Sequence, residues 1–338
     1  MDILKKDANL SDVDDSLKNG RPYRVGIYAV PGFALMSYAC CVEPFRAANI
    51  LSRETLYELV HFSKTASSES SVGAFVQPDH GLSSGVNLDI LFVIAGGDPI
   101  GFSDPLFFKW LRQLAYRNVV IAGVSGGPVL LAKSGLMEGH RMTVHWEHAE
   151  GLSEILPNLL LEKKRFVIDR DRMTCGGGMA ALDLTHAIIN KHHGAEFARL
   201  VSDWFLHTDI RAPSDPQRGG LVERLGLTSA PILAAVAAME NHIADPLTLE
   251  QLADQSGVTS RQLNRLFQDK IGNTTMGFYR NLRLDVGFQL LGNSPLSVTE
   301  IGLATGFAGS AHFSSAFSKC YGYPPSRLRK KNPPKPLD

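Results

Sequence analysis

The chain has 338 residues, of which 44% are hydrophobic, and its 34 basic residues balance its 34 acidic ones. This length predicts two globular domains, and the composition is that of an ordinary α/β protein rather than a disordered or fibrous one. An apolar run of about 18 residues is absent, which excludes a membrane-spanning helix, and the acidic start Met1–Asp15 is not expected to be a signal peptide.

The polar segment up to about Gly20 is expected to be a disordered leader. The cysteines show no metal-binding spacing, and two of them are adjacent, which argues against a structural disulfide. No metal site is predicted, because no histidine or cysteine pair has a third ligand nearby, and no cofactor is expected. A reducing cytoplasm is therefore the expected location. The four cysteines are Cys40, Cys41, Cys175 and Cys320.

Strand and helix patterns alternate along residues 21–207, which predicts a mainly parallel sheet with helices on both faces. The expected strands are Tyr23–Val30, Leu56–Lys64, Leu88–Ile94, Val119–Val124 and the hairpin of Phe166–Asp169 with Arg172–Cys175. The expected helices are Ser37–Leu51, Asp104–Tyr116, Pro128–Gly135 and Met179–His192.

The run Val124-Ser125-Gly126-Gly127 joins a predicted strand directly to a predicted helix. A sharp turn of this kind, flanked by small residues, lifts one side chain above the sheet, as a nucleophile elbow does. Ligands of parallel sheets bind beyond the carboxyl ends of the strands. We therefore expect a site around Ser125.

Glu43, Gly96-Gly97, Thr143-Val-His-Trp146 and Gly176-Gly-Gly178 accompany this run, and together they resemble the class I glutamine-amidotransferase-like, PfpI-type fold over about residues 23–205. The resemblance implies a flavodoxin-like α/β domain. Catalytic members of that fold carry a cysteine at the elbow with a supporting histidine, whereas this chain has Ser125. Serine needs an adjacent base, and His145 is the candidate for it. The preferred interpretation is a pocket that has lost its chemistry; the alternative is a Ser125-dependent amidase or hydrolase.

A zwitterion with an amine group is the expected ligand. The face of Trp146 would attract a quaternary or alkylated ammonium, with Glu43 or Asp98 as anionic partners, and backbone N–H groups near the glycine pairs would suit a carboxylate. The alternative is that Phe33 and Trp146 are only core residues. The predicted ligand contacts are Glu43, Gly97, Ser125, Gly126, His145 and Trp146.

Residues 208–227 are predicted to be a linker, because the stretch Asp209–Gly220 contains two prolines, a glycine pair and polar residues. Two helix-turn-helix patterns follow, Leu247–Phe267 and Leu296–Phe317, about fifty residues apart. In each pattern a short amphipathic helix runs into a glycine, which takes the left-handed conformation that a tight corner requires. The tandem predicts an all-α DNA-binding domain over residues 228–330.

Charge supports this interpretation, because residues 256–335 contain eleven basic and three acidic side chains, a net excess of eight positive charges. Arginine suits the guanine edge, and asparagine suits adenine. The alternative to a DNA-binding domain is a small helical bundle that makes contacts with other proteins.

This part of the chain resembles the AraC family of transcriptional regulators. The resemblance covers about residues 228–330 and is carried by the Leu252–Gly257 turn, the run Ile301–Phe307 and the ending Tyr321–Arg329. It implies that a linker helix, Thr275–Leu291, holds two reading helices in successive major-groove segments. Ser315 stands where many relatives carry arginine, so lighter contacts are expected from the second helix. The implied DNA contacts are Arg261, Asn264 and Arg265 on the first helix and Ser310, His312, Ser314 and Ser315 on the second.

The two halves together resemble the GlxA-like subgroup of regulators, which includes proteins that respond to glycine betaine, carnitine or arginine. We therefore predict a cytoplasmic, ligand-responsive transcription regulator of amine or amino-acid metabolism, an activator rather than a repressor. Its predicted partners are promoter DNA, an amine-bearing metabolite, a second copy of the chain and, for an activator, RNA polymerase. The rivals are the Ser125 hydrolase with an attached DNA-binding module and a constitutive DNA-binding protein with a dead sensor. The end of the chain, residues 331–338, is expected to be a flexible tail.

Overall fold

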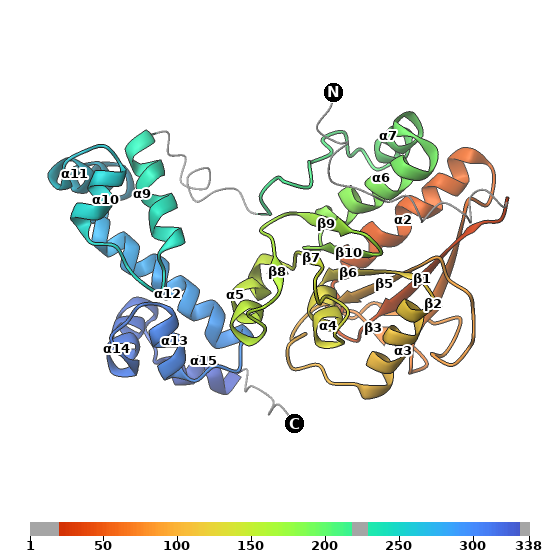
Figure 1. The fold of residues 1–338 in the computed structure, drawn as a ribbon, viewed down its shortest axis with the longest axis horizontal. Helices are drawn as coiled ribbons and strands as arrows, with labels where there is room; N and C mark the ends of the chain where they lie inside the picture. The colour runs from red at the N-terminus through yellow and green to blue at the C-terminus, as the bar shows by residue number, and fades with distance from the viewer. Residues whose placement is uncertain (1–19, 218–228, 332–338) are drawn as a thin grey trace. The chain divides into compact units, whose positions relative to one another are not determined.

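The computed structural model describes residues 20–217 and 229–331, which form two compact units that divide after Gln217 (Figure 1). The first unit thus extends beyond the predicted boundary at residue 207 and takes up the first part of the predicted linker. The predicted leader, the rest of the linker and the tail lie almost entirely outside the described residues. Within the described ranges, no helix is long and apolar enough to cross a membrane.

A six-stranded sheet in the order β2-β1-β5-β6-β10-β9 forms the centre of the first unit. The first five strands in this order pair in parallel, and β9 pairs antiparallel with β10, so the expected flavodoxin-like α/β fold is confirmed. The strands are β1 (Tyr23–Ala29), β2 (Tyr57–Phe62), β5 (Ile90–Ala95), β6 (Val120–Ser125), β9 (Phe166–Asp169) and β10 (Arg172–Cys175).

Helices cover both faces of this sheet (Figure 1). One face packs against α2 (Leu35–Ser52), α6 (Met179–His193) and α7 (Ala195–Trp204). The other packs against α3 (Pro105–Tyr116), α4 (Gly127–Lys133) and α5 (Trp146–Ile155). The sequence predicted four of these helices but not α5 or α7.

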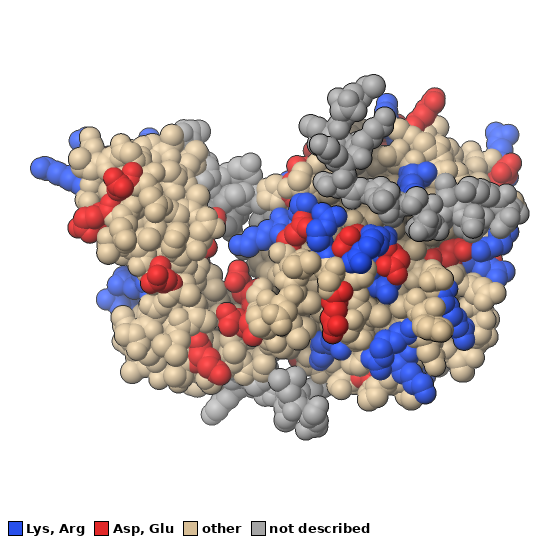
Figure 2. All heavy atoms as spheres, viewed as in Figure 1, with Lys and Arg blue, Asp and Glu red and all other residues tan. Residues whose placement is uncertain are grey.

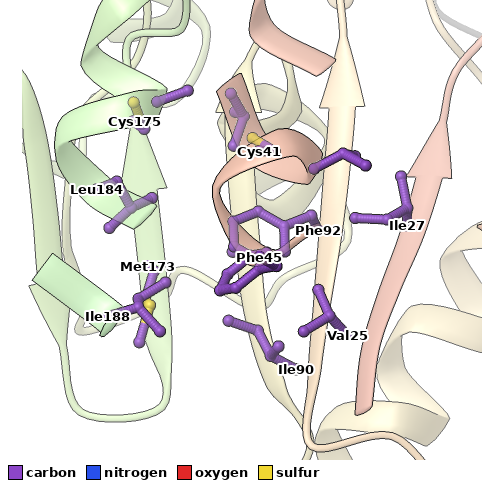
Figure 3. Packing of buried hydrophobic residues seen from close by; sticks show 14 of the residues in the cluster. Val25, Ile27, Cys41, Phe45, Ile90, Phe92, Met173, Cys175, Leu184 and Ile188 are labelled. Atoms are coloured by element: carbon purple, nitrogen blue, oxygen red, sulfur yellow. The ribbon is translucent and has the colours of Figure 1, made fainter. Parts of the chain in front are cut away.

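Each face of the sheet has its own hydrophobic core, because successive strand residues point to opposite sides. In β5, Phe92 belongs to the cluster under α2, whereas its neighbours Leu91 and Val93 belong to the cluster under α3. Figure 3 shows the first cluster, where Phe45 from α2 lies against Phe92 with ring centroids 6.0 Å apart. Complete burial of such a side chain stabilises the fold by about 2 kcal/mol.

Two small pairs of strands complete the unit. β3 (Ser68–Glu69) pairs antiparallel with β4 (Phe75–Val76), and β7 (Arg141–Met142) pairs in parallel with β8 (Leu160–Leu161). The sequence did not predict them, because two residues are too few to show a period.

The four cysteines are free thiols. Cys41 and Cys175 are buried in the first core, and burial raises the pKa of Cys175 to about 12. Cys40 is half-buried, with a thiol pKa raised by burial to about 11, whereas Cys320 is exposed.

The second unit is all helical over its described residues, as predicted. Thr248, Thr259 and Ser297 each begin a helix with a capping box, in which the hydroxyl and the side chain three residues later satisfy each other's backbone N–H groups. The helices are α9 (Ala230–Asn241), α10 (Leu249–Gln255), α11 (Ser260–Ile271), α12 (Thr275–Asn293), α13 (Val298–Ala304), α14 (Ser310–Tyr321) and α15 (Pro325–Lys331).

Helices α10 with α11 and α13 with α14 form the two helix-turn-helix pairs. One hydrophobic cluster, with Phe267 at its centre, lies under α9, α10 and α11, and a second, with Phe313 and Phe317, lies under α13 and α14. The long helix α12 contributes to both clusters. The turn glycines Gly257 and Gly306 have φ angles of 67° and 71°, the left-handed conformation that the sequence predicted.

Candidate functional site

The strand-to-helix elbow predicted at Ser125 is present. Ser125 is the last residue of β6 and has a φ angle of 60°, a left-handed conformation that costs a non-glycine residue about 1–2 kcal/mol. A side chain at Gly127 would place its Cβ only 2.0 Å from the carbonyl oxygen of Val93. Position 127 must therefore be glycine if the start of α4 is to pack against β5. The backbone of Ser125 and the glycine at position 127 thus form the elbow at the carboxyl end of β6.

Two further predicted contacts lie at the same edge of the sheet. Ala95, at the end of β5, pairs with Ser125, and its carbonyl oxygen accepts a hydrogen bond from the Gly126 N–H at 3.1 Å. Gly97 follows with a φ angle of 62° and has open space on its Cβ side. The structure thus brings Gly97, Ser125 and Gly126 together at the carboxyl ends of neighbouring parallel strands.

Ser37, a residue that the sequence analysis did not single out, completes the floor of the elbow. Its buried hydroxyl accepts a hydrogen bond from the Gly178 N–H at 2.8 Å. A Cβ on Gly177 would lie 2.6 Å from Ser125 Cβ and 2.9 Å from Ser37 Oγ, so both serines pack against this glycine. Ser37 and Ser125 are about 90 residues apart in sequence, and Ser125 and Gly177 about 50. No local sequence pattern could have predicted that they meet.

Glu43 lies farther along α2 than a pocket contact requires. It follows Ser37 by six residues, about 9 Å along the axis, and its carboxylate forms a 2.6 Å ion pair with Arg46. Its charge therefore has a partner within the same helix.

His145 approaches Ser125 through backbone atoms. Its N–H donates to the Ser125 carbonyl oxygen at 3.5 Å, while its imidazole Nδ1 accepts a hydrogen bond from the Glu147 N–H at 3.4 Å and so caps α5. Among the described residues, no hydrogen bond joins the His145 and Ser125 side chains. The Nδ1 of His145 is thus engaged at the start of its own helix.

Trp146 and Phe33 have different environments. Phe33 is completely buried in the first core, as the alternative interpretation expected for it. Trp146 is half-buried at the start of α5, its ring centroid lies 5.2 Å from that of His145, and its backbone N–H donates to Oε1 of Gln217 at 2.9 Å.

His148, one turn into α5, carries a buried polar atom without a partner in the described part of the chain. The side chain is 4% exposed, and its Nδ1 has no hydrogen-bond partner. Burial lowers the pKa of this imidazole to about 4, so it is neutral at pH 7. Buried polar atoms are seldom left unpaired in folded proteins. Across the described ranges, no group of three or more His, Cys, Asp or Glu side chains is placed to hold a metal ion.

Of the predicted DNA contacts on α11, the two arginines are exposed and the asparagine is hydrogen-bonded within the fold. Arg261 is exposed, and Arg265, whose side chain is 82% exposed, lies 3.5 Å from Asp269. Asn264 is half-buried, and its Oδ1 accepts a hydrogen bond from the N–H of Thr275, the first residue of α12. Its side chain therefore ties α11 to the linker helix.

On α14, His312 and Ser315 are exposed, and Ser310 and Ser314 are half-buried. The His312 ring lies edge-on to Phe307, with centroids 5.4 Å apart. In Figure 2, the visible face of the second unit carries acidic side chains, and basic ones protrude at its left margin.

Helix α12 fixes the two helix-turn-helix pairs against each other. The Tyr279 hydroxyl donates to the His242 carbonyl oxygen at the end of α9. Farther along the helix, Arg283 donates to the carbonyl oxygens of Thr305 and Gly306 at 2.8 and 2.9 Å, and its guanidinium lies 4.4 Å from the centre of the Phe307 ring. Arg283, which counted toward the basic surface, is thus used inside the fold.

At Gly306 the second pair also touches the loop that leads into the first pair. A Cβ at this position would lie 2.6 Å from Pro246 Cγ and 2.7 Å from the Ile243 carbonyl oxygen, both in the loop before α10. The spacing between α11 and α14, the second helices of the two pairs, is therefore set by packing as well as by α12.

Comparison with known proteins identifies both parts of the chain. Residues 24–191 match the DJ-1/PfpI family, and residues 252–331 match a helix-turn-helix domain family. The HTH-type transcriptional regulator GlxA of Rhizobium meliloti is 41% identical over 91% of this chain and 96% of its own length. The regulators CdhR and ArgR of Pseudomonas aeruginosa are 36% and 34% identical over 89% and 92% of this chain, and over 89% and 94% of their own lengths.

Solved structures agree with the fold. A ThiJ/PfpI family protein from Pseudomonas syringae has a TM-score of 0.51 at 19% identity, covering 70% of this chain and 91% of that one. A transcriptional regulator from Vibrio parahaemolyticus has a TM-score of 0.50 at 22% identity, covering 55% of this chain and all of that one.

Proposed function

The chain belongs to the family of HTH-type transcriptional regulators that join a DJ-1/PfpI domain to an AraC-type helix-turn-helix domain, and from this premise we propose that it is a ligand-responsive regulator of amine or amino-acid metabolism. The observation that carries the DNA-binding half is the outer face of α11. Arg261 and Arg265 are exposed there on a helix whose spacing from α14 is fixed by Arg283 and Gly306.

Arg261 and Arg265 are the proposed base-reading residues. Arginine forms two hydrogen bonds to the guanine edge, each such pair giving about 1–3 kcal/mol of discrimination against a wrong base. Helix α14 offers His312 and Ser315 as exposed side chains and Ser310 and Ser314 closer to the fold. This inventory favours sequence reading by α11 and positioning on the backbone by α14.

Footprinting and gel-shift titrations with DNA from upstream of the gene and its neighbours test this half. Arg261→Ala and Arg265→Ala should each weaken specific binding by about tenfold or more and relax the preference at one base. Arg280→Ala, an exposed residue on α12, is the charge-matched control and should weaken all sequences alike. If the wild-type protein prefers no sequence, or if the control loses as much specificity, the proposal fails.

The sensor half is proposed to be the elbow region, with Gly97, Ser125 and Gly126 facing a small zwitterion and Trp146 beside it. Backbone N–H groups at this edge suit a carboxylate, and an aromatic face suits the ammonium end. A thermal-shift screen with glycine betaine, carnitine and arginine tests it, because a ligand that binds only the folded state raises the midpoint.

We also infer that the protein acts without catalysis. The left-handed Ser125 favours the rival hydrolase, since a nucleophile elbow has this backbone, but His145 directs its Nδ1 at its own helix. Incubation with amide and ester substrates separates the two functions. Turnover that disappears in Ser125→Ala would establish the hydrolase instead.

The mode of action that we propose is activation by a homodimer. Two copies would place four reading helices on a promoter, and the ligand would favour one placement over another by binding one arrangement more tightly. Sedimentation with and without promoter DNA tests the dimer. A promoter–reporter fusion in a strain with and without the gene tests the sign, and a reporter that rises on deletion would contradict activation.

A further inference from the structure

A cavity of about 120 Å³ lies in the first unit between helix α3 and the segment of residues 81–88, which leads into β5. None of the residues that line this cavity is a predicted ligand contact at the Ser125 elbow. An apolar cavity of about 150 Å³ is large enough to bind benzene. This cavity is therefore large enough for the apolar part of a small molecule, at a place that the proposed sensor site does not use.

The inner wall of the cavity is aromatic and aliphatic. Trp110 of α3 and Phe62 of β2 line it, are 8% and 4% exposed, and have ring centroids 5.4 Å apart. The Trp110 ring also lies 5.8 Å from the ring of Tyr28 in β1. Buried Leu88 and Leu114 complete the wall. Because these side chains belong to the core under α3, the wall offers an apolar surface that is already held in place.

The outer wall is a segment that is attached at both of its ends. At one end the His80 carbonyl oxygen accepts a backbone hydrogen bond, and at the other the Asp89 N–H donates one to β1 at 3.0 Å. Between these points Leu82 and Val86 are half-buried and pack against the same core, and Gly85 turns the chain with a φ angle of 69°. The cavity is therefore bounded by a tethered segment on this side.

Arg117 supplies the charge of the cavity. Of the described residues that line it, Arg117 is the only one with a charged side chain. It follows the end of α3 and is exposed, and within the described ranges its guanidinium forms no hydrogen bond or ion pair. Ser83, Ser84 and Gln113 are also exposed and add neutral polar groups. The solvent side of the cavity thus carries one positive charge above an apolar wall.

These two sides together define the chemistry of a matching ligand. Its apolar part would bury surface against Trp110 and Leu114, as in most small-molecule sites, where few polar groups fix the orientation. Its charged part would be a carboxylate, because two carboxylate oxygens accept two parallel N–H bonds from one guanidinium. An amine has the wrong charge for this cavity, and an inorganic anion has no apolar part. The volume limits the apolar part to a short branched chain or a small ring.

We propose that this cavity binds a short branched-chain monocarboxylate, with its alkyl group against Trp110 and its carboxylate on Arg117. The inference goes beyond the proposed sensor function and does not depend on it. The ligand also differs from the zwitterion proposed for the elbow, because no described acidic side chain lines this cavity to receive an ammonium group. The first unit would then carry two small-molecule sites of different specificity.

Fluorine NMR on the full chain labelled with fluorotryptophan tests the proposal, because the three tryptophans are Trp110, Trp146 and Trp204. Trp110 lines the cavity, whereas Trp146 lies beside the elbow. Single replacements by phenylalanine assign the three resonances. Isovalerate should shift the Trp110 resonance in a saturable manner, with a dissociation constant on the order of 1 mM for so small a ligand. The resonances of Trp146 and Trp204 should stay in place.

Three further compounds at equal ionic strength separate charge from shape. Isovaleramide has nearly the same shape without the charge and should bind about fivefold more weakly, the effect of a surface ion pair. Isopentylamine carries a positive charge and should leave the Trp110 resonance unshifted at the same concentration. Acetate has the charge without the branched chain and should bind at least about tenfold more weakly, because it buries little apolar area.

Variants of Arg117 test the carboxylate contact. Arg117→Ala should remove the preference for isovalerate over isovaleramide, whereas Arg117→Lys should keep most of it, because lysine retains the charge. Arg199→Ala, at an exposed position on α7, is the matched control and should bind as the wild type does. The unshifted resonances of Trp146 and Trp204 report that each variant is folded.

The absence of a Trp110 shift with isovalerate would overturn the site. Equal shifts by isovaleramide or isopentylamine, or a preference that persists in Arg117→Ala, would overturn recognition of a carboxylate by Arg117. A shift as large with acetate would overturn the apolar contact. A shift of the Trp146 resonance alone would place the carboxylate at the elbow, which contradicts this proposal and leaves the sensor proposal standing.

Discussion

Arg283 donates a hydrogen bond from Nη2 to the carbonyl oxygen of Gly306 at 2.9 Å, and this contact joins the long helix α12 to the turn of the second helix-turn-helix pair. The two carbonyl oxygens that Arg283 satisfies, together with the Phe307 ring beneath its guanidinium, belong to one corner of the chain. A residue that composition assigns to the DNA-binding surface therefore sets the geometry of that surface instead.

Replacement of Arg283 by alanine should destabilise the second unit by about 2–4 kcal/mol, since two hydrogen bonds from a charged donor and a ring contact are lost. Specific DNA affinity should fall with it, because α14 is no longer held relative to α11. Urea unfolding followed by circular dichroism, with footprinting on the same preparations, measures both. Arg280→Ala serves as the exposed control, and equal stability of the two variants would contradict the structural role of Arg283.

Gly257 and Gly306 form a matched pair for testing the contact between the two helix-turn-helix pairs. Both are left-handed, but a Cβ at Gly257 meets open space, whereas one at Gly306 meets Pro246 and Ile243. Gly257→Ala should cost about 1 kcal/mol for the backbone alone, and Gly306→Ala should cost about 1–3 kcal/mol more for the clash. Chemical unfolding of the two variants gives the difference. Equal costs would mean that the loop before α10 moves aside freely.

The buried His148 makes the first unit sensitive to acid. Its folded pKa of about 4 lies below the ordinary value of 6.5, so between these values the unfolded chain binds more protons. The contribution of neutral His148 to the free energy of unfolding is therefore fully present near pH 7. It falls by about 3 kcal/mol as the pH drops toward 4. Burial lowers the pKa of His140, His186 and His193 as well, which adds to the same trend.

His148→Phe should remove most of that dependence, and His80→Gln, an exposed position, should leave it unchanged. Tryptophan fluorescence during urea unfolding at a series of pH values provides the measurement, because all three tryptophans lie in the first unit. An unaltered pH profile in His148→Phe would place the titrating group elsewhere.

Arg165 and Asp183 form a buried ion pair, with side chains 7% and 0% exposed, and the same carboxylate holds His207. Asp183→Asn should destabilise the first unit by about 3–5 kcal/mol, since Arg165 keeps its charge without a partner. The exposed Asp203→Asn is the control. Replacing both partners, as Arg165→Met with Asp183→Leu, should recover much of the loss, and a double variant as unstable as the single one would argue against an unpaired charge as the cause.

Elements with a clear local signal were predictable from the sequence, and contacts across the fold were not. The apolar runs of β5 and β6 and the glycine-flanked Ser125 defined the central strands and the elbow, and Gly257 and Gly306 defined both helical corners. Helix α5 was missed because His145 caps it, and histidine is not a typical N-cap residue.

The contacts of Ser37 and of Gln217 arise from long-range packing and could not be predicted from the sequence. Ser37 meets Gly178, 141 positions later, and Gln217 meets Thr143, 74 positions earlier, and neither pairing leaves a trace in composition or period. The compact units divide after Gln217, ten residues beyond the predicted boundary at residue 207, and this packing too is long-range. Proline and glycine in the stretch Asp209–Gly220 signal a turn-rich segment, but they do not say whether it packs on a domain.

The distribution of thiols offers a direct route to observing the second reading helix at work. Cys320 is exposed near the end of α14, whereas Cys41 and Cys175 are shielded by the first core and Cys40 is half-buried. A maleimide dye at near-neutral pH should attach at Cys320 and leave the others unmodified. The native chain therefore carries a natural labelling position from which energy transfer to a dye on an oligonucleotide can follow docking in real time.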